Sequence, residues 1–177
     1  MNHNGTTRKQ ATPVELSALL VECVCVPGPG EQEAVRPLAA AVQVSPEAIS
    51  EELLYLRAFA VDFAVLMSLG DAPAKDQILS LYYEHWQRID EQAAGTRAAL
   101  EERLQGYAAV VGDVTPGHGG LARQLGLALV GHIGADPGSA AGDAAGELMI
   151  FGARLFAVLY DEVTSLLTEV DILLLDE

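Results

Sequence analysis

The chain has 177 residues, half of them apolar, and its 25 acidic and 10 basic side chains give a formal net charge of −15. This apolar fraction argues against intrinsic disorder. The acidic balance, with no cluster of Lys or Arg to offset it, argues against nucleic acid and anionic membranes as primary partners. Because Ala and Leu dominate the apolar residues, the composition favours helices.

Residues 1–12 are polar and lack periodicity, so they are expected to form a disordered N-terminal tail. The remainder, 13–177, is long enough to bury its own core and is expected to form a single helical domain. Its first helix is expected to begin at Pro13, because proline suits the first helical position, and to end at the following "PGPG". A second helical segment covers 31–43, where Pro37 predicts either a kink or a late start.

The segment "VSPEAIS" predicts a clean start for a long central helix. Ser45 can cap it and the next residue is proline, so the helix is expected over 46–69. Gly70 supplies a left-handed stop, and Asp71 can cap another helix over 72–93. With so short a connection, these two helices are expected to pack as a tight antiparallel hairpin.

Three further helices are expected, over 96–111, 119–134 and 142–167. No strand-like alternation persists in the sequence. The predicted fold is therefore all-α: a compact bundle of six or seven helices with the hairpin at its centre. A narrow apolar stripe spaced four, three and four residues apart, which is typical of a coiled-coil seam, consists of Leu100, Leu104, Tyr107 and Val111.

Asp62 stands in an otherwise almost wholly apolar stretch, "RAFAVDFAVLMSLGD" at 57–71. A lone buried carboxylate is costly, so it should have a hydrogen-bond donor or reach water. Equal rise per residue along the two hairpin helices places Asp62 level with Leu79 and Ser80 and about 9 Å from the height of His85. We therefore expect a hydroxyl, from Ser80 or a nearby tyrosine, to be its partner, and not the imidazole.

The segment "LYYEHWQ" at 81–87 is the richest polar and aromatic cluster of the chain. His85 lies at the edge of the apolar helix face, where it could line a pocket or simply occupy a helix boundary. The hairpin register places Arg57 level with Glu84. The candidate polar cluster consists of Arg57, Asp62, Tyr82, Glu84 and His85.

No metal site or cofactor is expected. Cys23 and Cys25 point about 200° apart on a helix, and no pair of histidines has ligand spacing. His132 falls in the last turn of its helix, where it can interact with the negative helix end. Neighbouring acids such as Glu51 and Glu52 do not share a helix face, and they are expected to be solvated.

The absence of a complete catalytic set, together with the high apolar fraction and the seam, favours a non-enzymatic interaction or structural protein that self-associates. A homo-oligomer is therefore expected, and a further protein partner is left open. The alternative is a small-molecule-binding protein or an enzyme of unknown class, with a pocket near Arg57, Tyr82 and His85. Neither a signal peptide nor a membrane span is evident, which predicts a cytoplasmic protein.

Overall fold

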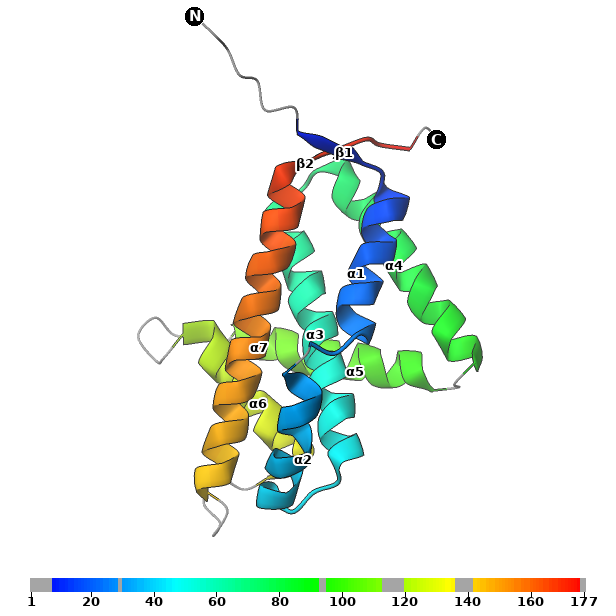
Figure 1. Cartoon of the computed structure of the whole chain (residues 1–177). Coiled ribbons are helices and arrows are strands. Elements are labelled where there is room, and N and C mark those ends of the chain that lie inside the picture. Colours follow the sequence, from blue (N-terminus) through cyan, green and yellow to red (C-terminus); the bar gives the residue numbers. More distant parts are fainter. Residues whose placement is uncertain (1–7, 29, 93–94, 113–119, 136–141, 176–177) are drawn as a thin grey trace, which may run out of the picture.

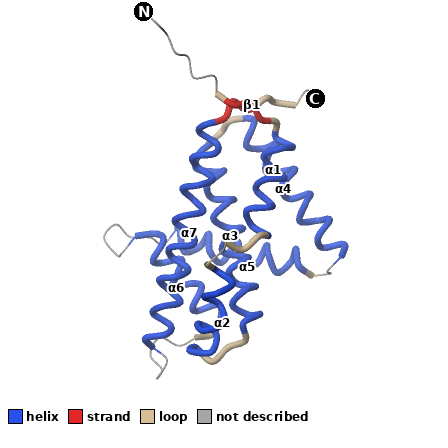
Figure 2. Tube along the Cα trace, viewed as in Figure 1, coloured by secondary structure: helices blue, strands red, loops and turns tan. Residues whose placement is uncertain are grey.

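The computed structural model of the chain describes residues 8–28, 30–92, 95–112, 120–135 and 142–175. In these residues seven α-helices and two short strands form a bundle (Figures 1 and 2), which confirms the all-α prediction. None of the described helices is both long and apolar enough to cross a membrane. In chain order the elements are β1 (Lys9–Ala11), α1 (Pro13–Cys25), α2 (Glu31–Val42), α3 (Pro46–Leu69), α4 (Pro73–Gln92), α5 (Thr96–Gly112), α6 (Gly120–Ile133), α7 (Gly142–Glu169) and β2 (Val170–Ile172).

Helix α3 is the central helix of the bundle, and most of its side chains between Leu53 and Val65 are buried. It packs most extensively on α7, which in turn packs on α6 (Figure 1). Helices α6 and α7 approach so closely that a Cβ atom added at Gly126 would lie 2.2 Å from the backbone oxygen of Met149. The glycine is therefore required by this helix contact, and not by a turn.

The predicted helix boundaries are close to the observed ones because local capping groups determine them. Thr12 and Glu15 form a capping box at the start of α1: the Thr12 hydroxyl accepts from the Glu15 amide at 3.3 Å, and the Glu15 carboxylate accepts from the Thr12 amide at 2.9 Å. At the start of α3, the Ser45 hydroxyl accepts from the Ala48 amide at 3.1 Å. Gly70 ends α3 with a positive φ of 53°. Helix α2 runs through Pro37 from a start at Glu31.

The tight hairpin of α3 and α4 is not confirmed. The two helices are adjacent at their short connection, but α4 then leans away from α3 and packs mainly on α1 (Figure 1). A short connection keeps two helices together only at the turn. Farther along, the packing of the whole chain decides which helix covers the apolar face of α4.

The two strands are a departure from the sequence prediction. β1 and β2 pair in parallel, with Lys9 opposite Val170 and Ala11 opposite Ile172. Three residues are too few to show alternation in the sequence. Residues 9–11 are thus not part of a disordered tail, while the prediction for residues 1–7 lies outside the described residues. Beyond β2, the Gln77 side chain of α4 makes two hydrogen bonds of 3.1 Å with the backbone of Leu175.

Candidate functional site

The structure does not bring Arg57 together with the other candidate residues. The Arg57 side chain is buried, and its Nε donates to the backbone oxygen of Val24 at 2.7 Å. Its guanidinium also forms an ion pair with Glu31, another buried side chain. Arg57 therefore joins α3 to the end of α1 and the start of α2, and it does not pair with the predicted partner Glu84.

The remaining predicted residues of α4 lie in three different surroundings. Glu84 is exposed and pairs with Arg88 at 3.9 Å, which is the geometry of a weak surface ion pair. Tyr82 is fully buried, its ring meeting that of Trp86 edge-on, and burial raises its pKa. His85 is half-buried. Of four surface pockets formed by the described residues, none is lined by Tyr82 or His85.

Asp62 has the kind of partner that the sequence predicts. The hydroxyl of Tyr83 donates to Asp62 Oδ1 at 2.7 Å, so the partner is a nearby tyrosine and not Ser80. This tyrosine stands about one turn farther along α4 than the predicted register, because α4 leans away from α3 and a long side chain spans the gap. Burial raises the pKa of Asp62, and the hydrogen bond from Tyr83 offsets part of that effect.

Asp62 lies in the wall of a pocket of about 380 Å³ between α3, α4 and α5, called the Asp62 pocket below. Its aromatic wall consists of Phe59 and Phe63, whose rings are stacked with centroids 5.8 Å apart. Among the described residues, Asp62 forms no ion pair, so its charge in this pocket has no protein cation beside it. The other lining residues are Leu66, Tyr83, Leu104, Gln105, Ala108 and Val111.

A second polar site, which the sequence prediction missed, surrounds Glu52 of α3. Its side chain is almost wholly buried, with 4% of its surface exposed, although neighbouring acids were predicted to be solvated. Oε1 accepts from the Tyr107 hydroxyl at 2.8 Å and from His132 Nδ1 at 2.9 Å, while Arg103 Nε lies 2.9 Å from Oε2. Since a carboxylate can only accept, His132 must carry its proton on Nδ1.

The Glu52 cluster, consisting of Glu52, Arg103, Tyr107 and His132, therefore joins α3, α5 and α6. It opens on one side to a pocket of about 200 Å³ that Glu51 and Tyr55 also line. The Tyr55 hydroxyl donates to Glu51 at 2.8 Å, and burial together with this hydrogen bond raises the pKa of Tyr55 to about 12. Of the described residues that line this pocket, none is a serine, threonine or cysteine.

One sequence signal could have identified Glu52 as buried. It stands three residues after Ile49 and four before Leu56, both fully buried, so it shares their helix face. His132 likewise follows the buried Leu129 by three residues. The burial of an acid on a helix depends on the residues three and four positions away, not on its immediate neighbours. The pairing of Glu51 with Glu52 in the sequence therefore gave no indication of the cluster.

Among the described residues, no three side chains of metal-binding types gather closely enough to hold an ion. Comparisons of the chain with models of protein families, with curated proteins and with solved structures found no match.

Proposed function

We propose that the chain is a small-molecule-binding protein whose ligand carries an ammonium group on an apolar body and binds in the Asp62 pocket. The observation that carries this proposal is the half-buried carboxylate of Asp62, which has a hydrogen-bond donor but, in the described part of the chain, no cation. A carboxylate in apolar surroundings raises the free energy of the folded chain unless a positive charge compensates it. A cationic ligand would supply that charge.

The contrast with other buried charges supports this interpretation. The carboxylate of Glu52 is held by Arg103, and the guanidinium of Arg57 is held by Glu31. Asp62 differs from both because the hydrogen bond that it accepts from a described residue comes from a neutral phenol. The elevated pKa of Asp62 has the same origin, since burial disfavours its charged form.

The walls of the pocket favour the same class of ligand. Phe59 and Phe63 lie on the same side of α3 as Asp62, and the negative face of an aromatic ring attracts an ammonium group. The volume of about 380 Å³ falls within the roughly 300–1,000 Å³ of ordinary ligand pockets. A ligand with one aromatic or branched aliphatic group and one amine would fill it.

Calorimetric titration with three probes of similar shape tests the proposal: 2-phenylethylamine, 2-phenylethanol and phenylacetate. The amine is expected to bind more tightly than the alcohol, and the carboxylate is expected not to bind. Asp62→Asn keeps an acceptor for Tyr83 but removes the charge, so it should abolish the preference for the amine. Asp76→Asn is the matched control, because Asp76 is an exposed acid of α4 outside the pocket. Equal binding of amine and alcohol by the native protein would refute the proposal.

A second candidate function is that of a non-enzymatic interaction protein that self-associates. The seam at 100–111 gives it little support, because Leu100 and Tyr107 are buried within the fold. What favours it is a group of exposed aliphatic side chains at one side of the molecule: Val26 with 59% of its surface exposed, Ile150 with 47% and Val158 with 55%. Sedimentation over a range of concentrations tests it, and a monomer at every concentration contradicts it.

The cytoplasmic location belongs to the same set of proposals. Cys23 and Cys25 are both free thiols, which fits a reducing compartment. Cell fractionation followed by immunodetection checks this location, and recovery of the protein in an oxidising compartment contradicts it.

A further inference from the structure

Helix α7 exposes one line of side chains to solvent along most of its length. The apolar members, Ile150 and Val158, stand two turns apart with Arg154 between them. Two hollows flank this line, one of about 380 Å³ beside α2 and one of about 330 Å³ beside the connection of α1 and α2. The exposed Val26 shares the second hollow with Val158. The line, called the α7 face below, consists of Glu147, Ile150, Arg154, Val158 and Glu162.

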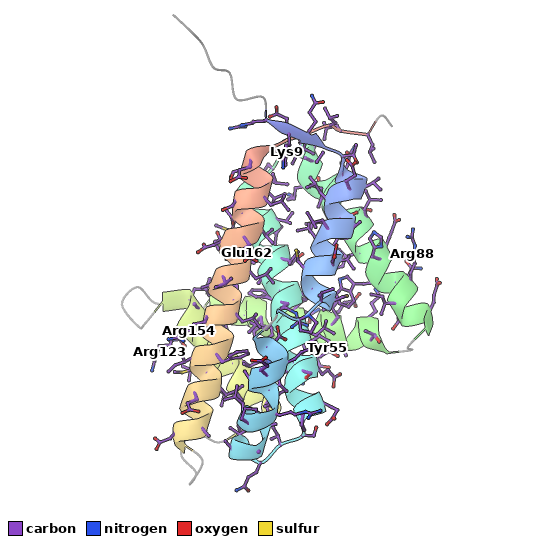
Figure 3. The ribbon with its side chains drawn as sticks, viewed as in Figure 1. Lys9, Tyr55, Arg88, Arg123, Arg154 and Glu162 are labelled. Carbon is purple, nitrogen blue, oxygen red and sulfur yellow. The ribbon has the colours of Figure 1, made fainter. Side chains whose placement is uncertain are left out.

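Two opposite charges of the α7 face have no partner in the described part of the molecule. Arg154 and Glu162 are exposed, and neither forms an ion pair or side-chain hydrogen bond with a described residue. Each stands four residues from Val158, which is about 6 Å along the helix axis. Figure 3 shows both side chains along α7. An apolar centre with a positive charge one turn before it and a negative charge one turn after it is self-complementary.

We propose that a second copy of the chain docks on the α7 face, with the two α7 helices antiparallel and a two-fold axis at Val158. This interface deepens the self-association put forward above as a second candidate function and rests on it. The two-fold axis brings Val158 against its own symmetry mate. It also places Arg154 of each copy opposite Glu162 of the other, so that the two-fold symmetry forms two equivalent ion pairs.

The charges favour this register over a symmetric one whose axis lies at Arg154. An axis at Arg154 would place Ile150 of one copy opposite Val158 of the other, which satisfies the apolar groups. It would also place the two Arg154 side chains against each other, and juxtaposed like charges oppose association. The axis at Val158 instead brings the two valines together and pairs both Arg154 and Glu162.

The dimensions of the α7 face predict a weak dimer. The stretch from Arg154 to Glu162, which faces its own symmetry mate across the axis, is about 12 Å long, and a helix with its side chains is about 10–12 Å wide. That area is well below the roughly 800 Å² per partner of a standard stable interface. The net charge of −15 on each copy adds long-range repulsion, which moderate salt screens. Dissociation is therefore expected in the micromolar range, at 0.15 M salt.

Sedimentation velocity between about 5 and 500 µM, at 0.15 M salt, tests the interface through charge reversal. Arg154→Glu and Glu162→Arg each create two repulsive pairs, so each should raise the dissociation constant by roughly tenfold. The double variant restores both pairs with reversed sign and should return the constant close to that of the native chain. Arg88→Glu is the matched control, because Arg88 is an exposed arginine of α4 on another side of the molecule (Figure 3).

The outcomes separate the interface from self-association itself. A native dimer whose single variants dissociate and whose double variant recovers supports the α7 interface. If the native chain dimerises but both single variants do so equally well, the interface is refuted while self-association stands. A native chain that stays monomeric up to 500 µM refutes both.

Discussion

The close contact between α6 and α7 provides the sharpest test of the structure, through one substitution made at two positions. Gly126→Ala and Gly131→Ala add the same methyl group to the same helix. At Gly126 that carbon would lie 2.2 Å from the backbone oxygen of Met149, whereas at Gly131 nothing lies within 4 Å. The two variants are therefore expected to change stability in opposite directions.

Two opposing terms determine the size of the effect. Alanine is favoured over glycine in a helix interior by about 0.8–1 kcal/mol. This gain applies at Gly126 and is smaller at Gly131, which lies in the last turn of α6. At Gly126 the clash involves backbone, so α6 must move about 1 Å from α7, which forfeits a quarter to a half of each dispersion contact across the interface. Overpacking of this kind costs roughly 1–3 kcal/mol or more. Gly126→Ala should thus lose about 1–2 kcal/mol and Gly131→Ala should gain about 0.5–1 kcal/mol.

Urea unfolding followed by circular dichroism measures both free energies against the native chain. For a chain of this size each kcal/mol shifts the Tm by about 2–4 °C, so the two variants should differ by roughly 3–12 °C in thermal melts. If Gly126→Ala proves as stable as Gly131→Ala, the contact between α6 and α7 does not require a glycine at position 126.

Three further predictions concern the buried charges. Glu52→Ala leaves the buried Tyr107 hydroxyl without its acceptor, while Arg103 keeps access to water, so it should lose about 1–3 kcal/mol of unfolding free energy. Glu51→Ala, which removes only an exposed side chain's hydrogen bond, should lose about 1 kcal/mol or less. Equal losses in urea unfolding would mean that Glu52 is solvated. Glu31→Leu leaves the buried charge of Arg57 without its partner, so it should lower the free energy of unfolding by about 3–5 kcal/mol. The double variant that also carries Arg57→Met should recover most of this loss. A double variant that is no more stable than Glu31→Leu in the same assay contradicts the pairing. Burial raises the pKa of Asp62 above its usual 3.8, so the folded chain holds this proton more tightly than the unfolded chain does. The free energy of unfolding of the native chain should therefore fall, relative to that of Asp62→Asn, as the pH rises from about 4 through the raised pKa. A difference between the two proteins that stays constant from pH 4 to 7 contradicts this prediction.

The candidate site was only partly predictable from the sequence. An acid in an apolar helix needs a donor, so a hydroxyl partner for Asp62 could be expected, and Tyr83 supplies it. Its exact partner depended on how far α4 leans away from α3, which no local pattern encodes. Arg57 shows the same limit, because its partner Glu31 is 26 residues away and meets it only when α2 folds over α3.

The sequence by itself determined the helices of this protein. Proline, capping residues and glycine act within a few residues of each helix end, and apolar spacing acts within one or two turns, so boundaries such as those of α3 follow from local chemistry. Only the tertiary structure decided which faces meet: α4 against α1, Gly126 against Met149, and Glu52 among donors from two other helices. These pairings join residues far apart in the chain, and their free energy depends on the packing of all seven described helices together.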